Sequence, residues 1–244
     1  MRSCTLSLPF AAVVLTLLDV GGLVKGNDDF MQALGGLFGG GGGAECKQFR
    51  CKKGSLPVMT EDGWNLWANG CGAMGIQVSS GEFNFTRCCD FHDVCYGICG
   101  MKMKICEDRF SQCLNNVCGA YGSEQKDSCL QTANTFKMGT KLLGCQLFQE
   151  SQNSNCQCVA KDTVQQKRKE DLDNLLHKYG DSRDGSALMG KKKSTNKYAK
   201  LVADVIEAHY PDSIEIRDPR RQRGKETDEA TISDSPHKAT EDEL

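Results

Sequence analysis

Cysteine is the residue that most limits how this chain can fold. The chain has 244 residues and fifteen cysteines, many more than a protein kept in a reducing compartment usually carries. This abundance indicates an oxidising compartment, where disulfides support a core that is too small to stabilise the fold alone. The formal net charge of −2 gives no indication of a nucleic-acid partner.

The N-terminus has the layout of a secretory signal peptide, which we predict over residues 1–26. Arg2 precedes an apolar run that is shorter than a membrane span, and small residues follow. The alternative is an uncleaved anchor, and Asp19 argues against it by interrupting the apolar run early. Cleavage removes Cys4 and leaves fourteen cysteines, an even number that allows seven disulfides.

Charge and cysteine placement divide the rest of the chain. Residues 27–162 hold all fourteen remaining cysteines, together with 12 Lys/Arg and 14 Asp/Glu. Residues 163–244 hold no cysteine, but they contain 16 Lys/Arg and 17 Asp/Glu. Apolar periodicity, which Pro211 ends, predicts a small helical hairpin in the second part. The predicted segments are an amphipathic stretch with a Gly-rich joint at 27–43, a disulfide domain at 44–162, a charged helical extension at 163–216 and a disordered tail at 217–244. The amphipathic stretch suits either core packing or contact with a membrane.

Residues 88–95 read CCDFHDVC and lie in a predicted helix between Thr86 and Gly100. The cysteines and the histidine recur there every three to four residues, which places them along one stripe. A second predicted helix runs from about Lys102 to Cys118. Both helices carry cysteines seven residues apart, about two turns, so that two antiparallel helices can be joined by disulfides. The sequence therefore predicts a mainly α-helical, disulfide-rich fold.

A zinc site is the alternative use for these cysteines and the histidine. Thiolate ligation belongs to reducing compartments, and adjacent cysteines cannot easily bind one tetrahedral ion. We therefore interpret the cysteines as structural, holding His92 and Asp93 in place.

The motif CCxxHDxCY, present as Cys88 to Tyr96, resembles the active-site helix of secreted phospholipase A2. NGCGAMG at 69–75 resembles that family's calcium loop, and CEDRFSQCL at 106–114 resembles its second long helix. Gly144-Cys145 and CQC at 156–158 are most similar to the group XII branch. The resemblance covers roughly residues 44–160.

The resemblance implies two antiparallel long helices, a calcium loop and a set of site residues. Its implied disulfides are Cys71–Cys89, Cys88–Cys113 and Cys95–Cys106, of which the last two agree with the helical spacing. His92 is implied as general base, with Glu107 orienting it where the family has an aspartate. The implied Ca²⁺ ligands are the Asp93 carboxylate and the carbonyls of Gly70, Gly72 and Met74, where the family usually has a third glycine. The alternative for this loop is a plain disulfide turn.

The chemistry of these residues suits ester hydrolysis. A neutral imidazole is an effective general base near neutral pH, and His92 is the only histidine in residues 27–162. A hard cation held by oxygen ligands can stabilise charge on a carbonyl oxygen. The resemblance implies calcium-dependent hydrolysis of the sn-2 ester of glycerophospholipids at a membrane surface, giving fatty acid and lysophospholipid. One alternative is a weakly active or inactive lipid-binding protein on the same scaffold, favoured by Glu107 and Met74; another is an extracellular module for protein partners.

Secretion is the expected destination. Asn84 begins an N-glycosylation sequon, which is used only on an exposed lumenal segment. The chain ends in EDEL at 241–244, which is close to the signal that returns proteins to the endoplasmic reticulum but also fits an acidic terminus without a role. A basic cleavage site at 220–223 would release it.

Overall fold

The computed structural model describes residues 46–73, 76–190 and 194–217, all of which belong to one compact unit. The predicted signal peptide, the segment 27–43, Met74 and all but the first residue of the predicted tail lie outside the described residues. Within the described ranges, no helix is both long and apolar enough to cross a membrane.

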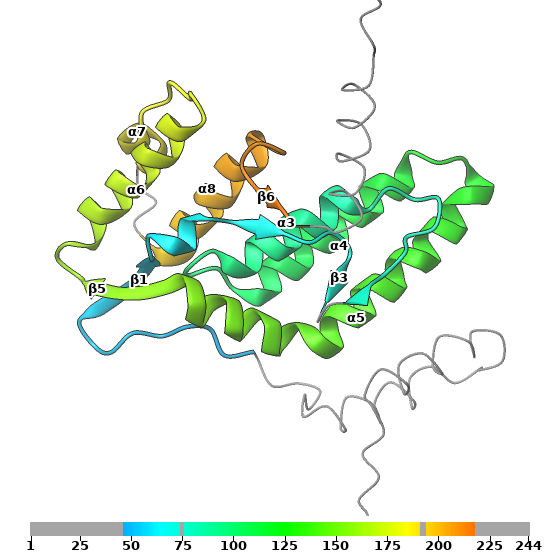
Figure 1. The fold of residues 1–244 in the computed structure, drawn as a ribbon, viewed down its shortest axis with the longest axis horizontal. Helices are drawn as coiled ribbons and strands as arrows, with labels where there is room; N and C mark the ends of the chain where they lie inside the picture. The colour runs from blue at the N-terminus through cyan, green and yellow to red at the C-terminus, as the bar shows by residue number, and fades with distance from the viewer. Residues whose placement is uncertain (1–45, 74–75, 191–193, 218–244) are drawn as a thin grey trace, which may run out of the picture. The chain divides into compact units, whose positions relative to one another are not determined.

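The fold is mainly α-helical and disulfide-rich, as the sequence predicts (Figure 1). The helices are η1 (Asp62–Trp64), α3 (Thr86–Gly97), α4 (Met103–Gly119), α5 (Ser123–Asn155), α6 (Val164–Lys178), α7 (Gly185–Met189) and α8 (Thr195–Ala208). Three two-stranded sheets join β1 (Ser55–Met59) to β5 (Cys156–Ala160), β2 (Trp67–Ala68) to β6 (Glu215–Ile216), and β3 (Gly72–Ala73) to β4 (Ile76–Gln77).

Helices α3 and α4 form the antiparallel pair that the sequence predicts. Cys88, near the start of α3, forms a disulfide with Cys113, near the end of α4. Cys95, near the end of α3, forms a disulfide with Cys106, near the start of α4. Because the start of each helix is bonded to the end of the other, the two helices run in opposite directions. The turn between them contains Gly100, whose φ of 81° lies in the left-handed region that favours glycine.

Helix α5 is the longest of the elements that were not predicted from the sequence. It spans 33 residues and packs against both α3 and α4. Its C-terminal end continues into β5, which pairs antiparallel with β1 in the register Pro57↔Cys158. All fourteen cysteines from Cys46 onward are paired, in the bridges Cys46–Cys145, Cys51–Cys158, Cys71–Cys89, Cys88–Cys113, Cys95–Cys106, Cys99–Cys156 and Cys118–Cys129.

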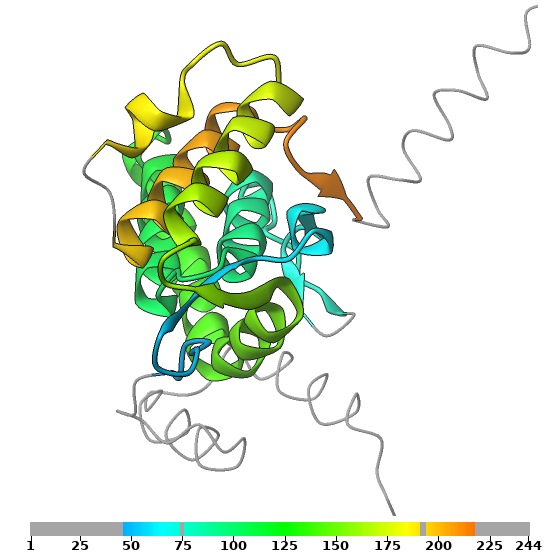
Figure 2. The same cartoon turned by 90° about the vertical axis from the view of Figure 1, so that its left-hand side faces the viewer.

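The extension is not separate from the disulfide domain. Helices α6 and α8 lie next to each other in both views (Figure 1, Figure 2). Their apolar faces share one core with Val94 of α3 and with Ile98, which directly follows that helix. The Tyr210 hydroxyl donates to the Asp90 carboxylate at 2.7 Å, and Asp90 is fully buried. Strand β6 then pairs parallel with β2, directly before the segment at 69–75. The boundary at residue 162 stays a prediction, but the two parts form a single packed unit because they share this core.

Candidate active site

His92 and Glu107 meet across the two disulfide-linked helices. The His92 Nε2 lies 2.7 Å from the Glu107 Oε1, a hydrogen-bond distance. His92 is 8% exposed, and its ring lies between the rings of Tyr96 and Phe110, whose centroids are 4.3 and 4.5 Å away. The ring is therefore held in orientation by packing as well as by the carboxylate.

Glu107 accepts hydrogen bonds from three side chains. Besides His92, the Tyr96 hydroxyl donates to its Oε1 at 2.6 Å, and the Thr140 hydroxyl of α5 donates to its Oε2 at 2.5 Å. Burial raises the pKa of Glu107, but the hydrogen bond and charge of His92 and the bonds from Thr140 and Tyr96 lower it below the ordinary value. An ionised carboxylate only accepts, so the His92 Nε2 carries the donated proton and the Nδ1 of the neutral ring keeps its lone pair.

Asp93 faces the loop that precedes β3. Its Oδ2 accepts a hydrogen bond from the backbone N–H of Asn69 at 3.1 Å. The Cys71–Cys89 disulfide fixes the same loop to the preceding turn of α3. Gly70 has a φ of 79°, a conformation that glycine adopts without steric cost, and it lets the chain turn tightly beside Asp93.

The oxygen atoms at this loop fit a hard cation such as Ca²⁺. The side-chain oxygen of Asn69 is buried, and the described residues provide no hydrogen-bond partner for it. Burial is the main reason that the pKa of Asp93 lies well above its usual range. The hydrogen bond from the Asn69 N–H lowers this pKa, whereas the charge of Asp90 raises it. Asp93 is half-buried, and a carboxylate that is partly removed from water is stabilised by a cation. The described residues contain no group of three His, Cys, Asp or Glu side chains suited to a metal, so an ion would need backbone carbonyls as well.

The predicted site residues therefore fall into two adjacent groups. His92 and Glu107 are joined by a hydrogen bond, and Asp93 lies beside the loop that contains Gly70 and Gly72. The fourth predicted ligand, Met74, lies outside the described residues.

Three residues that the sequence did not assign to the site are Thr140, Asn69 and Gly144. A Cβ added to Gly144 would clash with the Tyr96 hydroxyl and would lie 2.9 Å from the Met103 Cε, so glycine leaves room for the Tyr96 hydroxyl beside Glu107. A signal for α5 exists in retrospect: small or apolar residues recur every three or four positions at Cys129, Ala133, Phe136, Thr140, Gly144 and Phe148.

Two disulfide-linked antiparallel helices, with a histidine–carboxylate pair beside a glycine-containing loop, define the class of secreted phospholipase A2 folds. The family model described as group XII secretory phospholipase A2 precursor matches residues 11–166. The chain belongs to the group XII secretory phospholipase A2 family, as the sequence motifs predict.

Curated relatives agree with this assignment. The group XIIA secretory phospholipase A2 of Mus musculus is 31% identical over 138 residues, covering 54% of this chain and 71% of the relative. The Homo sapiens group XIIA protein is 30% identical over 138 residues, covering 54% and 72%. The Mus musculus group XIIB secretory phospholipase A2-like protein is 32% identical over 148 residues, covering 55% and 72%. No solved structure gives a significant match.

Proposed function

We propose that this chain is a secreted, calcium-dependent phospholipase A2 that hydrolyses the sn-2 ester of glycerophospholipids. The observation that carries the proposal is the hydrogen bond of 2.7 Å between His92 and Glu107. In this scheme the Nδ1 of His92 accepts a proton from water, and Glu107 stabilises the resulting imidazolium. The lowered pKa of Glu107 keeps it ionised through the pH range in which an imidazole titrates.

Calcium is part of the proposal. The carbonyls of Gly70 and Gly72 and the carboxylate of Asp93 are its proposed ligands, together with the carbonyl of Met74. When bound, Ca²⁺ supplies positive charge that stabilises the developing oxyanion of the ester. The Asn69 side-chain oxygen, for which the described residues provide no partner, and the half-buried Asp93 carboxylate support a cation at this loop.

The position of cleavage is tested with a phosphatidylcholine that carries different acyl chains at sn-1 and sn-2. The protein is incubated with vesicles of this lipid in the presence of calcium, and released fatty acids are identified by mass spectrometry. We expect release of the sn-2 acid. Release of the sn-1 acid alone would overturn the assignment of the cleaved ester.

The second candidate function is lipid binding with little or no hydrolysis. A relative named phospholipase A2-like and the glutamate at position 107 favour this candidate. It predicts that the protein sediments with the vesicles without releasing fatty acid.

Shortening Glu107 separates the two candidates. Glu107→Asp withdraws the carboxylate by about 1.5 Å from three donors that the longer side chain reaches. We expect the rate of hydrolysis to fall about tenfold or more, since small displacements of catalytic groups are costly. The control is Asp108→Glu, at an exposed residue that pairs with Lys104. A faster Glu107→Asp enzyme would instead mean that glutamate impairs the site, which favours the weakly active alternative.

Gly144 gives a test of the hydroxyl network. Gly144→Ala introduces a methyl group that displaces Tyr96 from Glu107, and we expect a fall in hydrolysis rate of about tenfold. Gly139→Ala is the matched control, because the same helix has no atom within 4 Å of the added Cβ there. Equal rates for the two variants would show that the Tyr96 hydroxyl does not matter for catalysis.

The proposed partner is a phospholipid membrane surface, bound peripherally. Trp67 and Val78 are 44% and 42% exposed, and they lie on either side of the 69–77 segment in the chain. Exposed tryptophan favours the interface between water and lipid. Their position next to the proposed calcium loop supports binding that brings this loop to the membrane.

The proposed destination is the extracellular space, in agreement with relatives that are named secretory. Asn84 is exposed, as a glycosylated asparagine must be. The alternative is retention in the endoplasmic reticulum by EDEL at 241–244.

The two destinations are compared by expressing the whole chain beside a version without its last four residues. We expect both proteins mainly in the medium, because Glu241 stands where the K-D-E-L retention signal has lysine. If the whole chain stays in the cell with an intact tail while the shortened chain is exported, the endoplasmic reticulum is the correct destination.

A further inference from the structure

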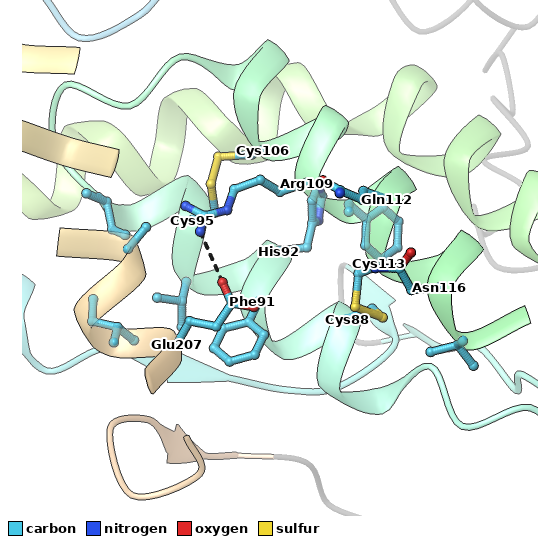
Figure 3. Close-up of a pocket in the computed structure, with 16 residues that line it drawn as sticks. Cys88, Phe91, His92, Cys95, Cys106, Arg109, Gln112, Cys113, Asn116 and Glu207 are labelled. Atoms are coloured by element: carbon cyan, nitrogen blue, oxygen red, sulfur yellow. Dashed lines mark hydrogen bonds and ion pairs between the residues drawn. A yellow bond between two sulfur atoms is a disulfide. The ribbon is translucent and has the colours of Figure 1, made fainter. Parts of the chain in front are cut away.

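The last described segment of the chain, residues 210–217, pairs with the strand that leads into the proposed calcium loop, and we call this segment the strap. It follows helix α8, which is fixed to α4 by an ion pair of 3.0 Å between Arg109 and Glu207 (Figure 3). The family model matches residues 11–166. The strap lies beyond this range, so the family comparison gives it no role.

The start of the strap is attached to the helix that carries His92 and Asp93. The Tyr210 hydroxyl donates to the carboxylate of Asp90 at 2.7 Å, and Asp90 is fully buried about one turn before Asp93 in α3. The Tyr210 ring also packs against Phe91, with 5.1 Å between the ring centroids. These contacts fix the position of the strap relative to α3.

The end of the strap holds a single peptide group at the entrance to the loop. The N–H of Arg217 donates to the Ala68 carbonyl at 2.8 Å. The N–H of Asn69 belongs to the same peptide group, and it donates to the Asp93 Oδ2 at 3.1 Å. A trans peptide group is planar, and its C=O and N–H point in opposite directions. The peptide between Ala68 and Asn69 therefore connects the strap to a proposed calcium ligand.

Water cannot easily replace the strap at this peptide. Ala68 is fully buried, and a buried carbonyl that loses its donor is costly. A second bond, from the N–H of Glu215 to the Leu66 carbonyl at 2.9 Å, holds β6 beside β2. Hydrogen bonds that share one peptide group also strengthen each other. The orientation of the Asn69 N–H therefore depends on the N–H of Arg217.

We propose that the strap positions the calcium loop and thereby raises the affinity of the protein for calcium. This proposal rests on the proposed function, which places Ca²⁺ between Asp93 and the loop. With the strap in place, the Asn69 N–H holds the loop and the Asp93 carboxylate together before calcium binds. Without the strap, calcium binding would include the cost of ordering them, and the affinity would fall. The N–H of Arg217 is thus a positioning group that acts through the peptide between Ala68 and Asn69.

The first test is the calcium dissociation constant of full-chain variants, measured by isothermal titration calorimetry. Arg217→Pro removes the N–H that bonds Ala68. Arg217→Ala is the matched control, because it removes the same side chain and keeps the N–H. We expect calcium to bind the proline variant about fivefold more weakly than the alanine variant, the factor that corresponds to one net hydrogen bond. Equal dissociation constants in the two folded variants would overturn the proposal.

A second pair of variants covers the case in which Arg217→Pro does not fold, as judged by circular dichroism. Glu215→Pro removes the hydrogen bond to the Leu66 carbonyl, whereas Glu215→Ala keeps it. Strand β6 belongs to a sheet of two strands and is therefore an edge strand, the place in a sheet where proline is tolerated. We again expect weaker calcium binding by the proline variant, and equal binding by the pair would count against the strap.

Hydrogen exchange gives a readout that a purely structural role would not change. Binding free energies of linked sites are reciprocal, so calcium should stabilise the strap by the same factor by which the strap favours calcium. We expect calcium to slow amide exchange at residues 213–217 of the wild-type chain about fivefold relative to EGTA, as measured by mass spectrometry. Helix α6 is the internal reference. Exchange in the strap that does not respond to bound calcium would show that the strap contributes only to stability.

Failure of the strap and failure of the proposed function give different results. Absence of calcium binding to the wild-type chain would overturn the calcium-dependent function and the strap together. Calcium binding that is equally strong in the proline and alanine variants would overturn the strap alone. An affinity for calcium that depends on the strap, in a protein that releases no fatty acid, would support the strap and overturn the hydrolytic function.

Discussion

His92→Gln is expected to reduce fatty-acid release by about four orders of magnitude, the scale on which removal of a general base acts. The glutamine amide can still donate a hydrogen bond toward Glu107, so the variant should keep the network and the fold. It has no basic nitrogen that can accept a proton from water. The rate is measured on phosphatidylcholine vesicles with calcium, and the fold is checked by circular dichroism and by the absence of free thiols.

His177→Gln is the matched control for this prediction. His177 is an exposed residue of α6, so its replacement should leave the rate unchanged. A folded His92→Gln protein that keeps more than about a tenth of the wild-type rate would show that His92 is not the base, since general-base catalysis contributes about a hundredfold or more.

Asp93→Asn is expected to weaken calcium binding and hydrolysis together. Asparagine can still accept the hydrogen bond from the Asn69 N–H, so the loop should keep its position. The proposed ion loses its only charged protein ligand, and we expect its dissociation constant to rise about tenfold or more. Isothermal titration calorimetry with calcium chloride measures this change directly.

Asp108→Asn serves as the control for the loss of one carboxylate, because Asp108 lies on the exposed face of α4. Calcium affinity that is the same in Asp93→Asn and in the wild type would show that the ligand set is wrong. Loss of hydrolysis with unchanged calcium affinity would give Asp93 a role other than binding the ion.

The helix pair was predictable because its information is local. Cysteines at helical spacing on two neighbouring segments allow few arrangements, and the motif around His92 and Asp93 lies within one of these segments. Glu107 was assigned from the family resemblance, which implies a carboxylate directly after the first cysteine of the second helix. The structure places its carboxylate within hydrogen-bond distance of His92, although it is one methylene longer than the aspartate of the family.

Helix α5 was not predicted because its sequence favours no structure strongly. It contains Gly139 and Gly144 together with many Ser, Thr and Asn residues, which are weaker helix formers than alanine or leucine. Disulfides at Cys129 and Cys145 and packing on α3 and α4 stabilise it instead. Thr140 could not be assigned to the site without this helix.

The extension was predicted as helices but not as part of the same core. Its stripe from Tyr198 to Ile206 indicates an amphipathic helix, yet a stripe does not identify what it packs against. The contact between Tyr210 and the buried Asp90 joins residues 120 positions apart. Such a contact depends on the tertiary arrangement, and no local pattern reports it.

The central claim is that His92, Glu107 and a calcium ion at Asp93 together hydrolyse phospholipid. Its most direct test is the rate of fatty-acid release from phosphatidylcholine vesicles by the purified wild-type chain, first with calcium, then with excess EGTA, and then after calcium is restored. We expect release with calcium, its loss with EGTA and its recovery when calcium returns. No release under any of the three conditions by a folded protein, or an equal rate in all three, would contradict the account.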